Sequence, residues 1–145
     1  MSSSSGTVTD AEYRGLLAFR DELRQFLHWS EQRAIDAGIT PAQYQLLLAV
    51  RGHPGGAPTV RDVADHLLLR HHSVVGLVDR AVAADLVERR PDPDDQRVVR
   101  LRLTPAGARV LRRLAGLHLQ ELRRRAPAFN PALLDGSAGD TEGEP

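Results

Sequence analysis

The fold of this chain is decided by residues 86–104, whose sequence is LVERRPDPDDQRVVRLRLT. The stretch opens with a short apolar and basic segment, reaches a tip of proline and aspartate at 91–95, and returns from Arg97 in alternation. The two faces of the returning segment are expected to be Val99, Leu101 and Leu103 on one side and Val98, Arg100 and Arg102 on the other. Alternation with a period of two across a Pro/Asp turn predicts a β-hairpin with one buried face and one wet face.

A helix-turn-helix is expected directly before this hairpin. Thr59 is placed to cap a short helix, residues 68–70 form a turn, and a second helix follows. The inward side chains of the second helix are expected to be Val74, Leu77, Val78 and Ala81. A hairpin with cationic side chains beside a helix-turn-helix is typical of the wing of a winged-helix DNA-binding domain, and we interpret the stretch in this way.

The first helix is longer than a small core needs. Thr9 and Glu12 form a capping-box pattern that opens a helix over about 10–37, and Gly38 ends it. Its apolar stripe consists of Tyr13, Leu16, Leu17, Leu23, Phe26, Leu27 and Ile35. Such a helix spans ~40 Å, so part of the stripe is expected to meet a second copy of the chain.

The remaining signals predict a mainly α fold with one small β-hairpin. Thr40, Pro41 and Gln43 form a second capping box, and a last long helix starts at Thr104-Pro105 and breaks at 126–127. The expected organisation is a disordered start (1–8), one domain (9–134) with a winged helix-turn-helix at about 40–104 between dimerisation helices at about 10–37 and 105–134, and a disordered acidic tail (135–145).

Composition sets limits on function. The chain has 145 residues with 19 basic and 19 acidic ones, and every basic one is Arg. The tail 135–145 holds four acids and no base, which leaves +4 on the rest. There is no Cys, which excludes disulfides, thiolate metal sites and a cysteine redox switch. With no visible signal peptide or apolar run of spanning length, we expect a cytoplasmic protein with no membrane partner.

The second helix of the helix-turn-helix carries candidate base contacts. Its first residues are expected to enter the major groove, as the start of a recognition helix does. Gly76 on the outward face lets the backbone approach DNA closely, and helix propensity gives no other reason for it. The candidates in this region are Thr59, Arg70, His71, His72, Ser73, Gly76 and Arg80. The alternative is a solvated face with an accidental glycine.

The hairpin carries candidate backbone contacts. Arg97 is expected in a minor groove, where narrow A·T tracts attract guanidinium groups, and Asp95 is expected to hold the tip in shape. Arg89 and Arg90 are expected on phosphates, which position a protein without reading sequence. The alternative for Arg97 and Asp95 is an ordinary exposed ion pair, worth little in water.

These residues together resemble the MarR family of bacterial transcription regulators. The shared pattern is Ala64-x-x-Leu67, Leu-Val-Asp-Arg at 77–80, Leu86-Val87, Arg89, Asp95-x-Arg97 and Leu103-Thr104 with Gly107, and it extends upstream to GITPAQYQLLLAV at 38–50. The resemblance covers roughly residues 10–125. It implies a homodimer joined through its first and last helices, binding to palindromic operators, and release by a small, often aromatic, ligand.

Two departures from the family pattern stand out. Asp85 occupies the place where the family usually has Gly, so we expect a strained left-handed residue there. The segment FNPALLDGSAGDTEGEP at 129–145 is too short and too polar for the long C-terminal helix that normally completes the dimer.

The effector site is predicted only through the resemblance. Tyr13, His28, Trp29 and Tyr44 lie on the two helices that flank the family's ligand cleft, and core or dimer packing is the alternative for each. No cofactor is expected.

Three other functions compete with this interpretation. A metal-responsive regulator is disfavoured because the histidines lack the i, i+4 spacing of zinc motifs, so we expect no metal site. An enzyme is disfavoured because there is no Cys nucleophile, phosphate loop or HExxH motif. A winged helix used only for protein contacts is the serious rival, and the salt dependence of duplex binding distinguishes it.

Overall fold

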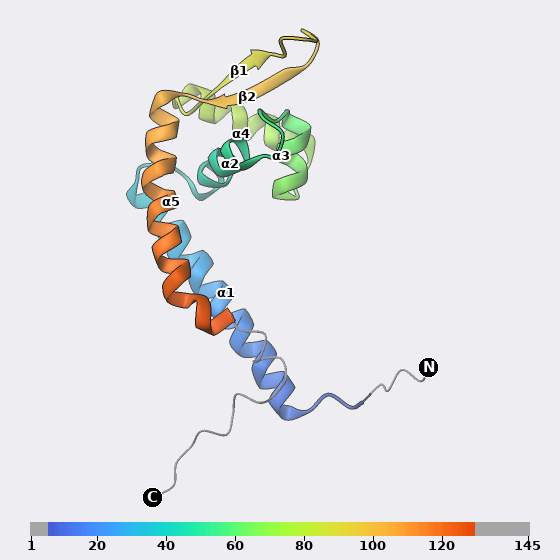
Figure 1. Cartoon of the computed structure of the whole chain (residues 1–145), viewed down its shortest axis with the longest axis vertical. Helices are drawn as coiled ribbons and strands as arrows, with labels where there is room; N and C mark the ends of the chain where they lie inside the picture. The colour runs from blue at the N-terminus through green and yellow to red at the C-terminus, as the bar shows by residue number, and fades with distance from the viewer. Residues whose placement is uncertain (1–5, 130–145) are drawn as a thin grey trace, which may run out of the picture. The chain divides into compact units, whose positions relative to one another are not determined.

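The computed structural model describes residues 6–129, which fall into two compact units. One unit contains the described residues up to Trp29 and from Leu119 onward, and the other contains Ser30–His118. The elements in order (Figure 1) are α1 (Asp10–Asp36), α2 (Pro41–Gly52), α3 (Val60–Leu67), α4 (His71–Ala83), β1 (Val87–Pro91), β2 (Val99–Leu103), α5 (Pro105–Arg125) and the 3-10 turn η1 (Ala126–Phe129). The expected mainly α fold with one antiparallel hairpin is confirmed.

The helices begin where the capping residues were expected. The Thr9, Thr40 and Thr59 hydroxyls each accept a hydrogen bond from the backbone N–H three residues later, at 3.1–3.2 Å. The side chain at that later position accepts in return from the threonine N–H in all three cases. These reciprocal bonds satisfy donors that a helix start leaves free, and each is local in sequence.

The hydrophobic core lies in the Ser30–His118 unit. Its completely buried side chains come from α1 to α5, both strands and the loop before α3, and the largest are Leu46, Leu47, Val63, Val74, Val78, Val87, Leu101 and Leu114. The four residues of α4 that were expected to face inward, Val74, Leu77, Val78 and Ala81, are all buried. The opposite face of α4 therefore points away from the core.

The hairpin pairs Val87 with Leu103 at its base and Pro91 with Val99 toward its tip. The expected alternation is only partly right. Leu101 is completely buried, but Val99 is 42% exposed because the strand has run past the core by that point. Arg100 was expected on the wet face and is instead half-buried, since its guanidinium is bonded within the protein.

A tight corner joins the hairpin to α5. The Thr104 hydroxyl donates to the Asp85 carbonyl oxygen at 2.6 Å and accepts from the Gly107 N–H at 3.0 Å. The Thr104 N–H donates to the Leu86 carbonyl oxygen at 3.1 Å. Gly107 has no room for a side chain, because a Cβ there would lie 2.0 Å from that same Leu86 oxygen. The threonine and glycine that end the sequence motif are therefore both required by packing.

The end of α4 confirms the expectation for Asp85. The Leu86 N–H bonds to the Ala81 oxygen at 2.9 Å and the Asp85 N–H to the Val82 oxygen at 3.0 Å. This is a Schellman ending, which places its penultimate residue in the left-handed region. Asp85 has φ +58°, in the place that glycine usually takes.

Among the described residues, the contacts between α1 and the end of α5 include an ion pair and an aromatic contact. Arg125 pairs with Glu22 at 3.2 Å, and the ring centroids of Phe19 and Phe129 lie 5.9 Å apart. Much of the α1 stripe is exposed within the single chain, including Leu16 at 50%, Leu17 at 58% and Leu27 at 48%. None of the helices over residues 6–129 has the length and apolarity needed to cross a membrane.

Predictions for both ends of the chain are not tested. The start of the chain up to residue 5, the short turn around 130–134 and the acidic tail 135–145 lie outside the described residues. The assignment of 9–134 to one domain stays a prediction.

Candidate nucleic-acid interface

The start of α4 is exposed. His71, His72 and Ser73 are all exposed, and the Arg70 carbonyl oxygen accepts from Ser73 N–H and Val74 N–H at 3.1 and 3.2 Å. The Arg70 side chain makes no capping bond and is free to extend outward. Imidazole, hydroxyl and guanidinium groups thus stand together at one helix end.

Gly76 follows one turn later on the same outward side. A Cβ at this position would lie 3.3 Å from an Arg80 guanidinium nitrogen, the far end of a flexible side chain. The space over Gly76 is therefore occupied by Arg80 rather than by core residues. A ligand can therefore contact the Gly76 backbone only if the Arg80 side chain moves away.

The turn between α3 and α4 has an unusual residue. Leu68 adopts φ +54° and is 91% exposed, and its N–H bonds back to the Ala64 oxygen. A left-handed leucine is strained, since its Cβ crowds the backbone. The turn nevertheless lets α4 begin only a few residues after α3 ends, which is the expected short helix-turn-helix connection.

The wing tip is built around Asp92. Its carboxylate accepts from the N–H groups of Asp94 and Asp95 at 2.8 and 3.0 Å, and from Arg100 Nε at 2.5 Å. These bonds hold the pKa of Asp92 below its usual range, with the Arg100 hydrogen bond the largest cause. Sequence reasoning assigned this role to Asp95 and missed Asp92, although Asp before a Pro-Asp pair is a turn signal.

Asp95 also makes bonds within the tip, and it orients Arg97. Its carboxylate accepts from Arg97 Nε at 3.0 Å, from Arg97 Nη2 at 3.1 Å and from the Arg97 N–H at 3.1 Å. These hydrogen bonds lower the pKa of Asp95 and raise the pKa of Arg97. The Arg97 side chain is still 90% exposed, so a fully charged guanidinium stands fixed at the tip with its outer edge in solvent.

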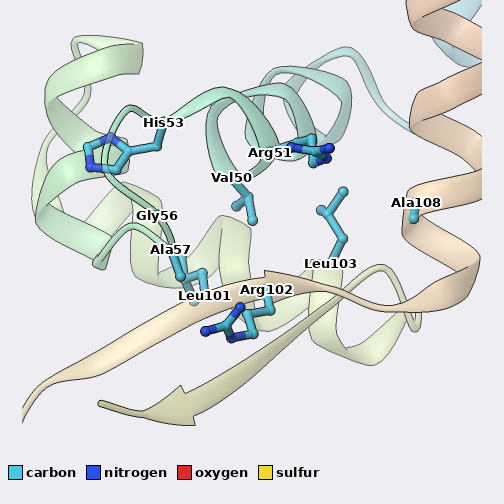
Figure 2. A pocket seen from close by; sticks show the side chains of 9 residues that line it. All are labelled: Val50, Arg51, His53, Gly56, Ala57, Leu101, Arg102, Leu103 and Ala108. Carbon is cyan, nitrogen blue, oxygen red and sulfur yellow. The ribbon is translucent and has the colours of Figure 1, made fainter. Parts of the chain in front are cut away.

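Strand β2 of the wing is tied to the loop between α2 and α3 (Figure 2). Arg100 Nη1 donates to the Ala57 carbonyl oxygen at 2.9 Å, and Leu101 N–H donates to the Pro58 oxygen at 2.8 Å. Arg100 therefore joins the Asp92 tip to this loop. These links help to hold the wing in place beside α3.

The two arginines of β1 are both paired. Arg89 donates to Asp79 of α4, and Arg90 donates to Glu88 at 2.8 Å. Because Arg89 bridges β1 and α4, it holds the wing to α4. Thr59 is likewise engaged, as the N-cap of α3.

Two histidines that are far apart in sequence meet beside α3. His53 Nδ1 and His66 Nε2 are 2.9 Å apart, and His53 Nε2 lies 3.6 Å from an Asp62 oxygen. Sequence spacing offered no sign of this pair, because it depends on how α2 and α3 pack. In the part of the chain that the structure describes, no group of three or more His, Cys, Asp or Glu residues is arranged to hold a metal ion.

The four residues expected at an effector cleft have different surroundings. Tyr44 is buried, stacks on His118 with ring centroids 4.4 Å apart, and has its pKa raised by burial. Trp29 stacks on Phe26 at 6.1 Å, while Tyr13 and His28 are exposed. His118, which sequence reasoning did not single out, donates from Nδ1 to the Leu114 oxygen and accepts at Nε2 from the Ser30 hydroxyl, both at 2.7 Å.

Comparisons with known proteins agree with this architecture. The MarR family model matches residues 37–98. The transcriptional repressor NicR of Pseudomonas putida is 33% identical over 81 residues, covering 56% of this chain and 50% of NicR. The chain spans about half to three fifths of the length of the curated relatives that it matches first.

Solved structures resemble the whole fold. AbsC of Streptomyces coelicolor, a MarR family regulator, superposes with a TM-score of 0.71 at 23% identity, covering 90% of this chain and 89% of AbsC. BpsR of Bordetella bronchiseptica, whose DNA binding is regulated by 6-hydroxynicotinic acid, has a TM-score of 0.63 at 27% identity, with 88% and 89% covered. The winged-helix segment thus matches the MarR family model, and the fold is that of solved MarR family regulators.

Proposed function

We propose that this protein is a sequence-specific DNA-binding transcriptional regulator. It acts as a homodimer on palindromic operators, as a repressor that a small ligand releases. The observation that carries the proposal is the pairing of an exposed α4 start, His71–Ser73, with a wing whose Arg97 is held outward by Asp95. Such a pair matches a recognition helix in the major groove and a wing arginine in the adjacent minor groove.

The contacts divide into three kinds. The α4 start, with Gly76 and Arg80, supplies base contacts, and Arg97 supplies charge at the wing tip. Arg89 keeps the wing on α4 through its bond to Asp79, so its contribution to DNA binding is mainly positional. This division predicts different effects for variants of the three groups.

The experiment is a titration of operator and scrambled duplexes at several salt concentrations. The Arg97→Ala variant should bind both duplexes at least tenfold more weakly. The slope of log affinity against log salt concentration should also become smaller by about one for each wing that contacts a phosphate. The matched control is Arg24→Ala, which removes an exposed, paired arginine of α1 and should leave affinity unchanged. Equal binding by Arg97→Ala and wild type contradicts the proposal.

The Asp95→Ala variant tests whether Asp95 positions the Arg97 side chain or only neutralises its charge. The Asp95→Ala variant removes a negative charge, which by itself strengthens attraction to DNA. It also frees the Arg97 side chain, so that ordering it on DNA costs entropy. We expect a net weakening of severalfold; a strengthened complex would show that Asp95 only neutralises Arg97.

Base readout is tested at the start of α4. The His72→Ala and Ser73→Ala variants should lose about 1–3 kcal/mol of discrimination between operator and random duplex. Nonspecific affinity should change little. A protein-interaction module, the main alternative, would show no log-linear salt dependence of duplex binding.

The homodimer is supported by the exposed apolar side chains of α1 and by Leu119 and Leu122 of α5, which are 51% and 40% exposed. Large apolar surface in one chain marks an interaction site. Sedimentation of Leu16→Asp and Leu23→Asp variants should show dissociation at concentrations where wild type is dimeric. A monomeric wild type at low micromolar concentration refutes this part of the proposal.

A further inference from the structure

The turn between α3 and α4 and the first residues of α4 form one continuous exposed segment. All six residues from Leu68 to Ser73 are exposed, and burial begins again at Val74. Leu68 has the most exposed side chain among the large hydrophobic residues of the described chain, at 91%. An almost fully exposed leucine therefore lies in the same short segment as the proposed base contacts at the start of α4.

Leu68 also has a backbone conformation that leucine rarely adopts. Its φ is +54°, and over residues 6–129 the only other non-glycine residue with a positive φ is Asp85. A short polar side chain such as aspartate can offset the cost of this conformation by hydrogen bonding locally, which leucine cannot do. The N–H groups of Leu68 and Leu69 both donate to the Ala64 oxygen, and a glycine would allow the same helix ending. Neither packing nor the end of α3 therefore requires a leucine at this position.

The residues that follow Leu68 indicate what kind of surface this segment contacts. Arg70, His71, His72 and Ser73 supply a cation, imidazoles and a hydroxyl, and no acidic residue lies among residues 68–73. An apolar protein surface placed here would bury these polar groups without partners, which is costly. The major groove of DNA instead offers hydrogen-bonding base edges together with one apolar group, the C5-methyl of thymine. Strained backbone is commonly retained at binding sites, so a DNA contact accounts for both the strain and the exposure.

We propose that Leu68 is a specificity-determining residue that contacts the C5-methyl group of a thymine in the major groove of the operator. The contact adds selection for thymine to the hydrogen-bonding readout by the start of α4. This inference rests on the proposed function, since it needs a duplex bound at that helix start. The leucine lowers folding stability and raises selectivity for thymine.

The size of one methyl group sets the expected effect. Burial of a single methyl group corresponds to about fourfold in affinity. In the proposed homodimer each chain contributes one such contact. A palindromic duplex with the thymine in both half-sites should therefore gain about 16-fold from the two contacts.

The test compares two duplexes that differ only in thymine methyl groups. A duplex that the protein selects from a random pool is prepared once with thymine and once with uracil, which pairs in the same way but lacks the methyl group. Titration at one salt concentration gives the ratio of the two affinities for each protein variant. Wild type should prefer the thymine duplex, and Leu68→Gly should reduce this preference about fourfold for each half-site that is contacted. Any effect of uracil on the shape of the duplex is common to both proteins and cancels in this comparison.

The matched control is Asp85→Gly, which relieves the other left-handed non-glycine residue without removing an apolar side chain. It should keep the thymine preference of wild type. Urea unfolding supplies a second measurement, in which Leu68→Gly and Asp85→Gly should both unfold at a higher urea concentration than wild type. A variant that gains stability and loses selectivity, as expected for Leu68→Gly, is not what a purely structural role would produce.

Three outcomes overturn the proposal: an equal thymine preference in wild type and Leu68→Gly, loss of the preference in Asp85→Gly, or unfolding of Leu68→Gly at a lower urea concentration than wild type. The last of these would show that Leu68 serves folding. Absence of duplex binding by wild type overturns the proposed function itself. Normal duplex binding with an unchanged ratio in Leu68→Gly overturns the leucine contact alone.

Discussion

Replacing Gly107 with alanine tests the corner between the wing and α5. A Cβ at Gly107 would lie 2.0 Å from the Leu86 carbonyl oxygen and 2.9 Å from its carbonyl carbon. Real Cβ atoms essentially never come within 3.0 Å of such atoms, so the corner must open by about 1 Å. Both partners are backbone, and no side-chain rotation relieves the clash.

The cost has two parts. Forced overpacking costs about 1–3 kcal/mol. The same Leu86 oxygen accepts the Thr104 N–H at 3.1 Å, and moving it away leaves a buried pair unsatisfied at about 1–3 kcal/mol. We therefore expect Gly107→Ala to lower the free energy of unfolding by about 4 kcal/mol. At about 2–4 °C per kcal/mol this lowers Tm by about 8–16 °C.

The matched control lies on the same helix. At Gly116 no atom beyond the adjacent residues and the helix's own backbone lies within 4 Å of the place that a Cβ would take. Gly116→Ala should therefore stabilise the protein by about 0.8–1 kcal/mol through helix propensity. Urea unfolding of both variants at one fixed protein concentration gives the comparison, since a dimer's stability depends on concentration. A Gly107→Ala variant within about 1 kcal/mol of wild type would refute the close approach.

Three further predictions concern single side chains. Asp85→Gly should stabilise the protein by about 0.5–1 kcal/mol in urea unfolding, because φ +58° no longer crowds a Cβ; a less stable variant contradicts this. Asp92→Ala should make the wing-tip amides exchange with solvent about tenfold faster, since their acceptor is lost; unchanged exchange rates measured by NMR would argue against it. The Arg124 and Arg125 side chains lower the pKa of Glu121 to about 2, so its contribution to stability is complete above the unfolded value near 4.3 and is lost as pH falls toward 2. The stability difference between wild type and Glu121→Gln should therefore be constant from pH 7 to 6 and shrink between about pH 5 and 2, and a difference that grows on acidification would exclude this pairing.

Local chemistry in the sequence was enough to predict the helices and the hairpin. The three threonine caps work through bonds to residues three positions away, so their partners can be read from the chain. The inward face of α4 follows from helical periodicity, whereas the left-handed conformation of Asp85 is expected from the resemblance, in which Gly usually occupies this place. The same signals located the wing arginine and its aspartate, Arg97 and Asp95, two residues apart.

Only the tertiary structure decided which polar groups meet across elements. Arg100 was expected on the solvent-facing side of β2, because alternation along a strand indicates only which side chains share a face. It does not show that the loop containing Ala57 lies beside the strand and accepts a hydrogen bond from Arg100. The bond of Arg89 to Asp79 and the His53–His66 pair join residues 10 and 13 positions apart, at distances set by how helices and strands pack. Gly107 is required because the backbone of Leu86 lies against the start of α5. These features arise from packing among distant segments, a geometry that no local sequence pattern encodes.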